Sequence, residues 1–299
     1  MNAIETSVDG WLPLTAPAKV NLMLAVHGRR EDGFHELTSV IAAVGHGDRL
    51  KVRIGHGADT LECTGAELPQ DASNLVLRAA KGFREATGCS EYFDFQLEKR
   101  IPVGAGLGGG SSDAVAALKG MNALLQCGLN AGQLRELAAG IGSDCPFFVE
   151  ARPSLMQGRG ERIEPLPEAA SQCLAGQQIV LFKPPFGVST AWAYSQLASR
   201  PQFFEKEAAT RARLEEFLQT GHCGNLLHNV FEPIVGAKYL ATSTLLKKLR
   251  EDGFDCLMSG SGSACFALIG DPKQTAELKS ACTDCWGESI FWVETSIAE

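Results

Sequence analysis

Apolar and polar residues alternate along several segments of the chain with the period of two that is typical of β-strands. In residues 18–26 the apolar side chains fall on one face, and Lys19 and Asn21 share the other. The polar segment 28–35 predicts a turn. The same alternation, or a short apolar run, predicts strands at residues 36–44, 48–54, 92–100, 178–183 and 289–295.

Other segments carry apolar residues three or four positions apart, which is the spacing of amphipathic helices. In residues 111–125, Val115, Leu118 and Met121 fall on one face. Helices are predicted at residues 74–87, 111–125, 131–141, 189–199, 205–219, 225–236, 239–251 and 272–282. The pattern restarts past residue 150, so we expect a domain boundary near residue 155, between domains of residues 1–155 and 156–299.

The composition is that of a globular protein, with 45% hydrophobic and 21% charged residues among 299. A net charge of −8 without a basic run argues against nucleic acid or an anionic membrane as a partner, whereas a small anionic substrate needs only a local positive field. No apolar run approaches the roughly 20 residues that span a bilayer, and the opening MNAIETSVDG is too polar for a secretory signal. We therefore expect a cytoplasmic protein.

Ten cysteines are spread along the chain. The one CxxC pair, Cys282 and Cys285, has no second pair at zinc-ligand spacing, so it is a weak metal motif. Free thiols at this density favour a reducing compartment.

The chemically most informative segment is PVGAGLGGGSSDAVAAL, which starts at Pro102, between a predicted strand and a predicted helix. Six of the seven residues at 104–110 are glycine or alanine, and glycine lets backbone amides approach a ligand closely. Ser111, Ser112 and Asp113 then open the helix, whose free N–H groups and positive dipole end attract anions. The segment predicts a cradle for phosphate groups.

Three alternative loop types match this segment less well. Gly104, Gly106 and Gly109 satisfy the GxGxxG pattern of dinucleotide folds. That pattern wants an acid at the end of a second strand, whereas the next acid after Asp113 is Glu136, inside a predicted helix. A P-loop needs a lysine after the glycines, and none follows. A merely structural turn has no need of so many glycines, since each costs backbone entropy on folding.

The segment resembles the second motif of the GHMP kinase superfamily, in which a proline precedes a GLGSS-like turn that wraps the nucleotide phosphates. Its GGGSSDA form resembles the branch that acts on 4-diphosphocytidyl-2-C-methyl-D-erythritol. Two further residues match positions of the family's nucleotide site. By pattern alone, Asn74 would be a helix cap and Lys99 a surface charge. The resemblance assigns to the nucleotide site Asn74, Lys99, Pro102, Gly104, Gly106, Gly108, Gly109, Gly110, Ser111 and Ser112, with Ser111 also as a metal ligand.

Residues 17–37, PAKVNLMLAVHGRREDGFHEL, resemble the first motif of the family. The pattern alone is equally typical of a solvated strand face, but the family's lysine and asparagine contact substrate at the positions of Lys19 and Asn21. Phe34 and His35 match a pair that binds the cytidine group. The family usually has tyrosine at the position of Phe34, and phenylalanine keeps the ring stacking without the hydroxyl.

Residues 258–268, MSGSGSACFAL, resemble the third motif, a loop near phosphates and substrate, which assigns Gly260 and Ser261 to the substrate site. Their glycines alone favour a hairpin turn. Asp144 lies in GSDCPFF, where the family has GADVP and its catalytic aspartate. By pattern alone Asp144 would be a helix or turn cap.

The segment KPPFGVSTAWAY, from Lys183, resembles a stretch on the substrate side, which adds Phe186, Ser189 and Thr190 to the substrate site. We expect one aromatic residue of this segment to form the second half of a cytosine sandwich. The residue type leaves three candidates open, namely Phe186, Trp192 and Tyr194.

The resemblance covers nearly the whole chain, and residues 200–245 match least. It implies an α+β fold of two GHMP kinase domains, the first binding the nucleotide, with the active site in the cleft between them. It also implies ATP and Mg²⁺, a small-molecule cytidylyl substrate, no nucleic acid or membrane partner, and a monomer or homodimer.

The implied reaction phosphorylates the substrate's 2-hydroxyl in non-mevalonate isoprenoid synthesis. Lys19 and Asp144 are the implied catalytic residues: Asp144 takes the hydroxyl proton and Lys19 lowers the pKa of that hydroxyl. Another GHMP kinase, acting on mevalonate, homoserine or a sugar, is the alternative. A non-catalytic nucleotide-binding module is disfavoured because both catalytic residues are present.

Overall fold

The computed structural model describes residues 9–298, which pack as two compact units. Unit 1 comprises the residues through Ala18, Gly47–Val103 and Gly108–Ala151. Unit 2 comprises Lys19–His46, Gly104–Leu107 and the residues from Arg152 onward. Each unit is therefore assembled from separate stretches of chain. The division into domains of residues 1–155 and 156–299 stays a prediction. Its boundary lies close to Arg152, where the chain passes from unit 1 to unit 2 for the last time.

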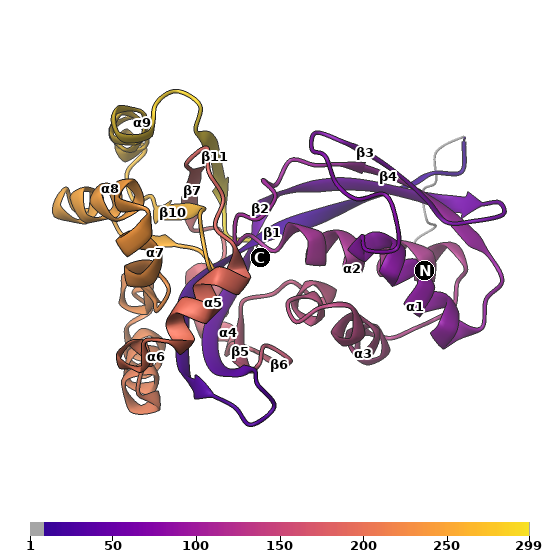
Figure 1. Ribbon diagram of the computed structural model, residues 1–299, viewed down its shortest axis with the longest axis horizontal. Helices are drawn as coiled ribbons and strands as arrows, with labels where there is room; N and C mark the ends of the chain where they lie inside the picture. Colours follow the sequence, from indigo (N-terminus) through magenta and orange to yellow (C-terminus); the bar gives the residue numbers. More distant parts are fainter. Residues whose placement is uncertain (1–8, 299) are drawn as a thin grey trace. The chain divides into compact units, whose positions relative to one another are not determined.

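Unit 1 is a sheet covered on one face by helices (Figure 1). β4 (Tyr92–Glu98) pairs antiparallel with the later part of β2 (His35–Gly55) and parallel with β3 (Thr60–Thr64). The beginning of β1 (Leu12–Arg29) completes this sheet, with strand order β3-β4-β2-β1. The helices are α1 (Leu75–Thr87), α2 (Gly109–Leu124) and α3 (Ala131–Ile141), followed by the 3-10 helix η1 (Cys145–Val149).

The core of unit 1 holds α2 directly against its sheet. Phe83 of α1 packs edge to face on Phe93 of β4, with ring centroids 6.3 Å apart. At Gly120 of α2 a Cβ atom would lie 2.5 Å from Cγ1 of Val52 and 2.6 Å from Cδ1 of Leu14. A larger residue would push the helix off the sheet, so glycine at this position sets how close α2 lies.

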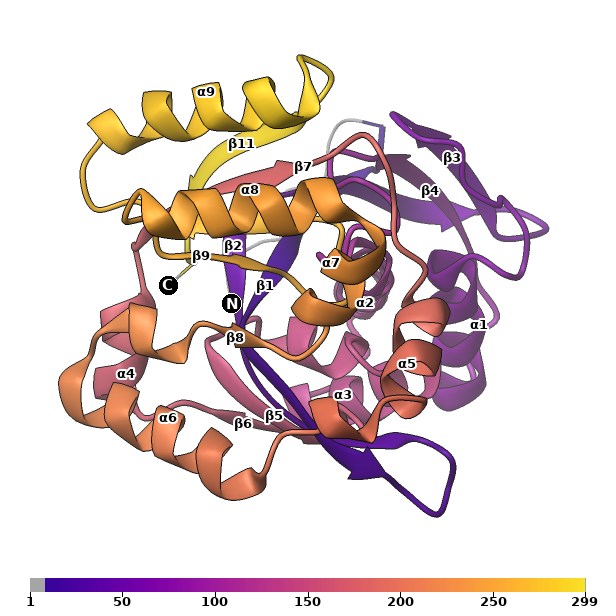
Figure 2. The same ribbon diagram turned by 60° about the vertical axis from the view of Figure 1, so that its left-hand side comes forward.

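One part of unit 2 is an antiparallel four-stranded sheet of order β11-β7-β10-β9. Its strands are β7 (Gln178–Lys183), β9 (Cys256–Met258), β10 (Cys265–Leu268) and β11 (Phe291–Ser296). Helices α8 (Leu240–Glu251) and α9 (Lys273–Trp286) lie side by side on one face of this sheet (Figure 2). Leu246 and Leu278 of these helices are fully buried.

The rest of unit 2 surrounds the later part of β1 and the earlier part of β2. β8 (His228–Asn229) pairs parallel with β1, and β5 (Ser154–Gly158) pairs antiparallel with β2 and with β6 (Arg162–Pro165). The helices are α4 (Glu168–Leu174), α5 (Thr190–Ala198), α6 (Glu207–Thr220), α7 (Glu232–Lys238), and the 3-10 helices η2 (Pro201–Phe203) and η3 (Cys223–Leu226).

Helices combined with mainly antiparallel sheets confirm the predicted α+β class. The predicted helix at 225–236 is wrong in its first half: η3 ends at Leu226, β8 follows, and α7 begins at Glu232. Proline is favoured in a first helical turn, so Pro233 marks the true start. Among residues 9–298, no helix is long and apolar enough to cross a membrane.

The two strands predicted at 36–44 and 48–54 form the single strand β2. Gly45 and Gly47 suggest a break, but Gly47 serves a close approach: its Cβ would lie 2.5 Å from the carbonyl oxygen of Ala16. β1 likewise begins earlier and ends later than predicted, so the turn is confined to residues 30–34. The short elements β3, β5, β6 and α4 lack clear periodicity, and the sequence pattern does not predict them.

Candidate active site

The glycine-rich loop leads into α2 with the backbone geometry of an anion site. Gly108 takes the N-cap position with a φ of 72°, a left-handed conformation that favours glycine, and no side chain of residues 9–298 caps the helix. The amide of Ser112 already donates to the carbonyl of Gly108, 3.0 Å away. The preceding amides, of Gly109, Gly110 and Ser111, belong to the first turn, which lacks intrahelical acceptors. The hydroxyl of Ser112 is buried and has no partner among the described residues.

Beneath this helix start lies a buried cluster of one lysine and two aspartates. Lys99 donates to the carboxylates of Asp48 and Asp113, the latter at 2.8 Å, and its side chain is only 4% exposed. The other oxygen of Asp48 accepts the backbone amides of Arg100 and Ile101, at 2.6 and 2.8 Å. The cluster therefore ties the residues between β4 and Pro102 to α2 near its start.

Burial dominates the electrostatics of this cluster. Burial is the largest cause that raises the pKa of Asp113, Lys99 opposes the rise and the charge of Asp48 adds to it, and the pKa that results is about 7. Burial acts to lower the pKa of Lys99, but the two aspartates outweigh it and the pKa is raised. Lys99 is therefore a buried ion-pair partner and not a surface charge, and its assignment to the nucleotide site stays a prediction.

Asn74 and Asp144 both stand at helix starts of unit 1. Asn74 caps α1, since its side-chain oxygen accepts the amide of Val76 at 2.9 Å. Asp144 occupies the N-cap position of η1 without a side-chain capping bond to the helix. The next residue, Cys145, forms a side-chain hydrogen bond with Ser111. Burial raises the pKa of the Cys145 thiol to about 11.

A lysine of α2 supports the turn that carries Asp144. Lys119 donates to the carbonyl oxygen of Phe148, 2.8 Å away, and burial lowers its pKa. The same helix therefore begins at the glycine loop and, three turns later, holds the backbone of η1. This link fixes the Asp144 turn relative to the helix start.

In unit 2, Lys19 and Asn21 lie on the same face of β1, as their spacing predicts, but this face is buried. Lys19 is 5% exposed, and its ammonium donates to Oδ1 of Asn21 at 2.6 Å. Asn21 donates from Nδ2 to the hydroxyl of Ser39 at 2.9 Å and from its backbone to Oγ of Ser259 at 3.3 Å. The solvated-face alternative is therefore excluded.

The first half of the glycine loop, Gly104–Leu107, crosses the loop of residues 258–264 at very short range. Ala264 donates to the carbonyl of Ala105 at 3.0 Å, and Ser259 Oγ donates to the carbonyl of Gly106 at 3.2 Å. A Cβ at Gly106 would overlap the carbonyl oxygen of Ser259, and one at Gly260 would lie 2.9 Å from the carbonyl oxygen of Gly106. This contact is why glycines are required in both loops.

The three aromatic candidates for the cytosine sandwich fall in two separate groups of unit 2. Tyr194 lies against His35, with ring centroids 5.3 Å apart, and Phe204 lies 6.2 Å from the same imidazole. Phe186 instead stacks on Tyr239 at 4.8 Å, and Trp192 meets Tyr239 edge-on. Among the three candidates for the second aromatic residue of the sandwich, the structure brings only Tyr194 to His35.

Phe34 and His35 follow the turn between β1 and β2. Phe34 is 49% exposed, which is unusual for so large an apolar side chain. Burial, helped by the charge of Arg29, lowers the pKa of His35 and keeps the imidazole neutral at pH 7. Its Nε2 atom is buried and finds no partner among the described residues. Such an atom is available to a ligand.

The remaining predicted substrate residues lie at the start of α5. Ser189 caps the helix by accepting the amide of Trp192, at 3.3 Å. Thr190 and Ser261 share a hydrogen bond of 2.8 Å between their hydroxyls. Ser263 donates to the carbonyl of Phe186 at 2.6 Å, which connects this segment to residues 258–268.

Lys19 and Asp144, the expected catalytic pair, belong to unit 2 and unit 1 respectively. Several residues that position the site escape prediction from the sequence, since each acts through a partner far away in the chain. Asp48 and Lys119 are two of them. Asn229 is another: it donates to the carbonyls of Met258 and Gly260, at 2.6 and 2.8 Å. No short motif marks any of the three.

Comparison with known proteins gives consistent matches along the chain. Residues 74–152 match the sequence model of the GHMP kinases N terminal domain, and residues 207–287 match that of the GHMP kinases C terminal domain. The 4-diphosphocytidyl-2-C-methyl-D-erythritol kinase of Synechococcus sp. (strain CC9902) is 40% identical over 93% of this chain and 97% of its own length.

Solved structures agree. A crystal structure of 4-(cytidine 5'-diphospho)-2C-methyl-D-erythritol kinase superposes with a TM-score of 0.75 and 35% identity, over 95% of this chain and 99% of that one. The homoserine kinase of Cytophaga hutchinsonii superposes with a TM-score of 0.73 at 19% identity, over 99% of this chain and 98% of that one, which shows a shared fold alone.

Proposed function

Because this chain belongs to the GHMP kinase family, and within it to the 4-diphosphocytidyl-2-C-methyl-D-erythritol kinases, we propose that it transfers the γ-phosphoryl group of ATP to the 2-hydroxyl of that substrate. The products are the 2-phosphate and ADP, within non-mevalonate isoprenoid synthesis. The observation that carries the proposal is the glycine loop, which ends in a helix start that no side chain of residues 9–298 caps, in a chain 40% identical to such a kinase.

Phosphoryl transfer depends on positioning and on neutralising charge. The amides of Gly109, Gly110 and Ser111 hold phosphate oxygens of ATP. The oxygen of the substrate hydroxyl bonds to the γ-phosphorus while the carboxylate of Asp144 accepts the hydroxyl proton. The bond between the γ-phosphorus and the oxygen that bridges it to the β-phosphate breaks, and ADP leaves with the electrons of that bond. Lys19 favours the ionised hydroxyl by its positive charge. Asn21 aligns Lys19 through their 2.6 Å hydrogen bond.

The cytidine group binds at Phe34, His35 and Tyr194 in this proposal. Phe34 offers an exposed ring face for stacking. The buried Nε2 of the neutral His35 can accept or donate a hydrogen bond at the base edge. The ring of Tyr194 packs against the imidazole of His35, with the ring centroids 5.3 Å apart. A ring nitrogen that is buried without a partner among the described residues favours a polar ligand at this position over a merely structural role for His35.

Mg²⁺ is the metal proposed to accompany ATP, because it neutralises phosphate charge. Among residues 9–298, no three His, Cys, Asp or Glu side chains gather as a metal site. Mg²⁺ is usually held by one or two protein ligands together with substrate phosphates and not by an all-protein cage. Ser111 is the proposed protein ligand, and its hydroxyl would have to leave Cys145 to take that role.

The test is ADP release by the purified protein with Mg²⁺-ATP and 4-diphosphocytidyl-2-C-methyl-D-erythritol, in parallel with mevalonate, homoserine and galactose. Turnover with the cytidylyl acceptor alone is the expected result. Turnover with another acceptor would refute the substrate while keeping the kinase. We further propose a cytoplasmic monomer or homodimer without a nucleic-acid or membrane partner, which light scattering and fractionation test.

A further inference from the structure

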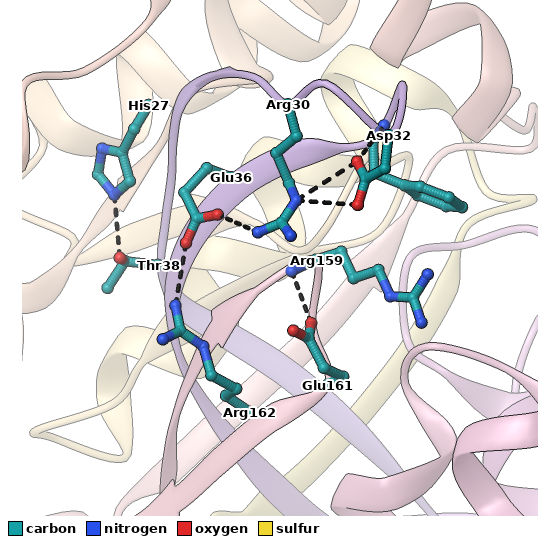
Figure 3. A network of polar contacts seen from close by, with 9 residues as sticks. His27, Arg30, Asp32, Glu36, Thr38, Arg159, Glu161 and Arg162 are labelled. Atoms are coloured by element: carbon teal, nitrogen blue, oxygen red, sulfur yellow. Dashed lines mark hydrogen bonds and ion pairs between the residues drawn. The ribbon is translucent and has the colours of Figure 1, made fainter.

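Two hairpins of unit 2 are joined by a chain of ion pairs beside the proposed cytidine site (Figure 3). Arg162 of β6 pairs with Oε1 of Glu36 at 3.0 Å, and Arg30 pairs with the other oxygen of Glu36. Arg30 also pairs with Asp32 at 3.1 Å. Asp32 in turn accepts the backbone amide of Phe34 at 3.1 Å. The turn that presents Phe34 is thus tied to the hairpin of β5 and β6.

The backbone places these hairpins next to each other. β2 and β5 pair antiparallel, with Leu37 opposite Gly158. Gly158 has a φ of 72°, and a Cβ there would lie 2.6 Å from the carboxylate of Glu161. That carboxylate accepts the amide of Arg159 at 2.7 Å. The turn after β5 is therefore closed by its own glutamate, and it directs Arg159 outward.

Arg159 differs from the other two arginines of this network. Arg30 and Arg162 are neutralised by carboxylates, whereas Arg159 has no carboxylate at ion-pair distance among residues 9–298. Its guanidinium lies over the ring of Phe34, 5.1 Å from the centroid. Asp32 acts on Arg159 only through a longer-range charge interaction. A guanidinium held on the ring proposed to stack cytosine, without a direct ion pair among the described residues, is suited to an anion.

We propose that Arg159 is a specificity-determining residue that binds the diphosphate of the cytidylyl substrate. This inference rests on the proposed function. The guanidinium is planar and suits phosphate oxygens, and its contact with Phe34 holds it where a stacked cytidine carries its phosphates. The Arg162–Glu36–Arg30–Asp32 chain positions the turn, and Arg159 distinguishes a nucleoside diphosphate from an uncharged nucleoside.

The test compares binding of CDP and of cytidine by calorimetry, together with steady-state kinetics, in the full-length protein. Arg159→Met keeps the aliphatic stem and removes the charge. We expect the Kd for CDP and the KM for the cytidylyl acceptor to rise about tenfold, with the Kd for cytidine, the KM for ATP and kcat unchanged. Arg159→Lys should recover part of the loss. Arg211→Met, at an exposed position of α6, is the matched control and should change nothing.

Equal weakening of CDP and cytidine would overturn the assignment, because Arg159 would then only support the Phe34 ring. No change in either would overturn it too. A selective loss of CDP binding in Arg29→Met, with Arg159→Met unaffected, would overturn it by moving the diphosphate to a different arginine beside the turn. Failure of the wild-type protein to phosphorylate the cytidylyl acceptor would instead refute the proposed function, and this inference with it.

Discussion

Replacing Lys99 by methionine should destabilise the protein strongly and in a pH-dependent way. Methionine fills a similar volume but removes the one positive charge of the buried cluster, leaving the carboxylates of Asp48 and Asp113 without a counter-charge. Breaking a buried pair in this way costs about 3–5 kcal/mol. The amides of Arg100 and Ile101 still solvate Asp48, which keeps the expected loss within that range.

The pH dependence follows from Asp113. Its pKa in the folded protein is about 7, above the ordinary value of 3.8, and loss of Lys99 raises it further. A carboxyl whose pKa is raised by folding contributes stability at low pH that is lost as pH rises through the folded pKa. Lys99→Met should therefore lose more stability at pH 8 than at pH 6, where protonation of Asp113 relieves one charge.

Urea unfolding followed by fluorescence at both pH values measures the effect. Lys81→Met is the matched control, since Lys81 is exposed and its pair with Glu85 spans 3.8 Å, and it should change the free energy of unfolding by less than about 0.5 kcal/mol. Adding Asp113→Asn to Lys99→Met should recover a large part of the loss. A loss below about 1 kcal/mol at pH 8, or one independent of pH, would refute the reasoning.

Three further predictions concern residues around the site. Asp144→Ala should lower kcat by roughly 10²–10⁴ while the protein stays folded by circular dichroism; a nearly unchanged kcat would remove Asp144 from the role of base. Lys119→Met should lower kcat about tenfold with little change in the KM for ATP, because the Asp144 turn loses its support, and Lys119→Arg should restore part of it; equal losses in kcat and ATP affinity would indicate a general packing defect. Gly106→Ala should lower the free energy of unfolding, measured by thermal unfolding, by roughly 2–4 kcal/mol because the new Cβ meets the carbonyl of Ser259. Gly104→Ala has open space for its Cβ and should lower the free energy of unfolding by only about 1 kcal/mol, because of its positive φ. Equal effects of the two glycine substitutions would argue against the crossing of the two loops.

Features set by local spacing could be predicted from the sequence, and features set by distant partners could not. The period of two along β1 places Lys19 and Asn21 on one face, as observed. The hydrogen bonds of Asn21 on this buried face go to Ser39 and Ser259, which no local pattern connects to β1. Lys99 is similar, since only the fold brings Asp48 to it from 51 positions away.

The errors have the same origin. Apolar residues at 225–236 have helical spacing, but β8 pairs with β1 and Asn229 anchors the segment to the carbonyls of Met258 and Gly260, so tertiary contacts override local propensity. The aromatic partner of His35 also depends on loop geometry. Residue type leaves Phe186, Trp192 and Tyr194 equivalent, and the ring contacts distinguish them.

The parallel pairing of β1 with β8 also has a consequence during synthesis of the chain. Met23 and Leu24 lie opposite His228 and Asn229, about 200 residues later. Translation proceeds at roughly 5–20 residues per second, so β8 is synthesised about 10–40 s after the strand β1 with which it pairs. During that interval the nascent chain exposes an apolar strand with open hydrogen-bonding groups. Ribosome-associated chaperones should therefore bind the emerging N-terminal segment and leave once α7 has been synthesised.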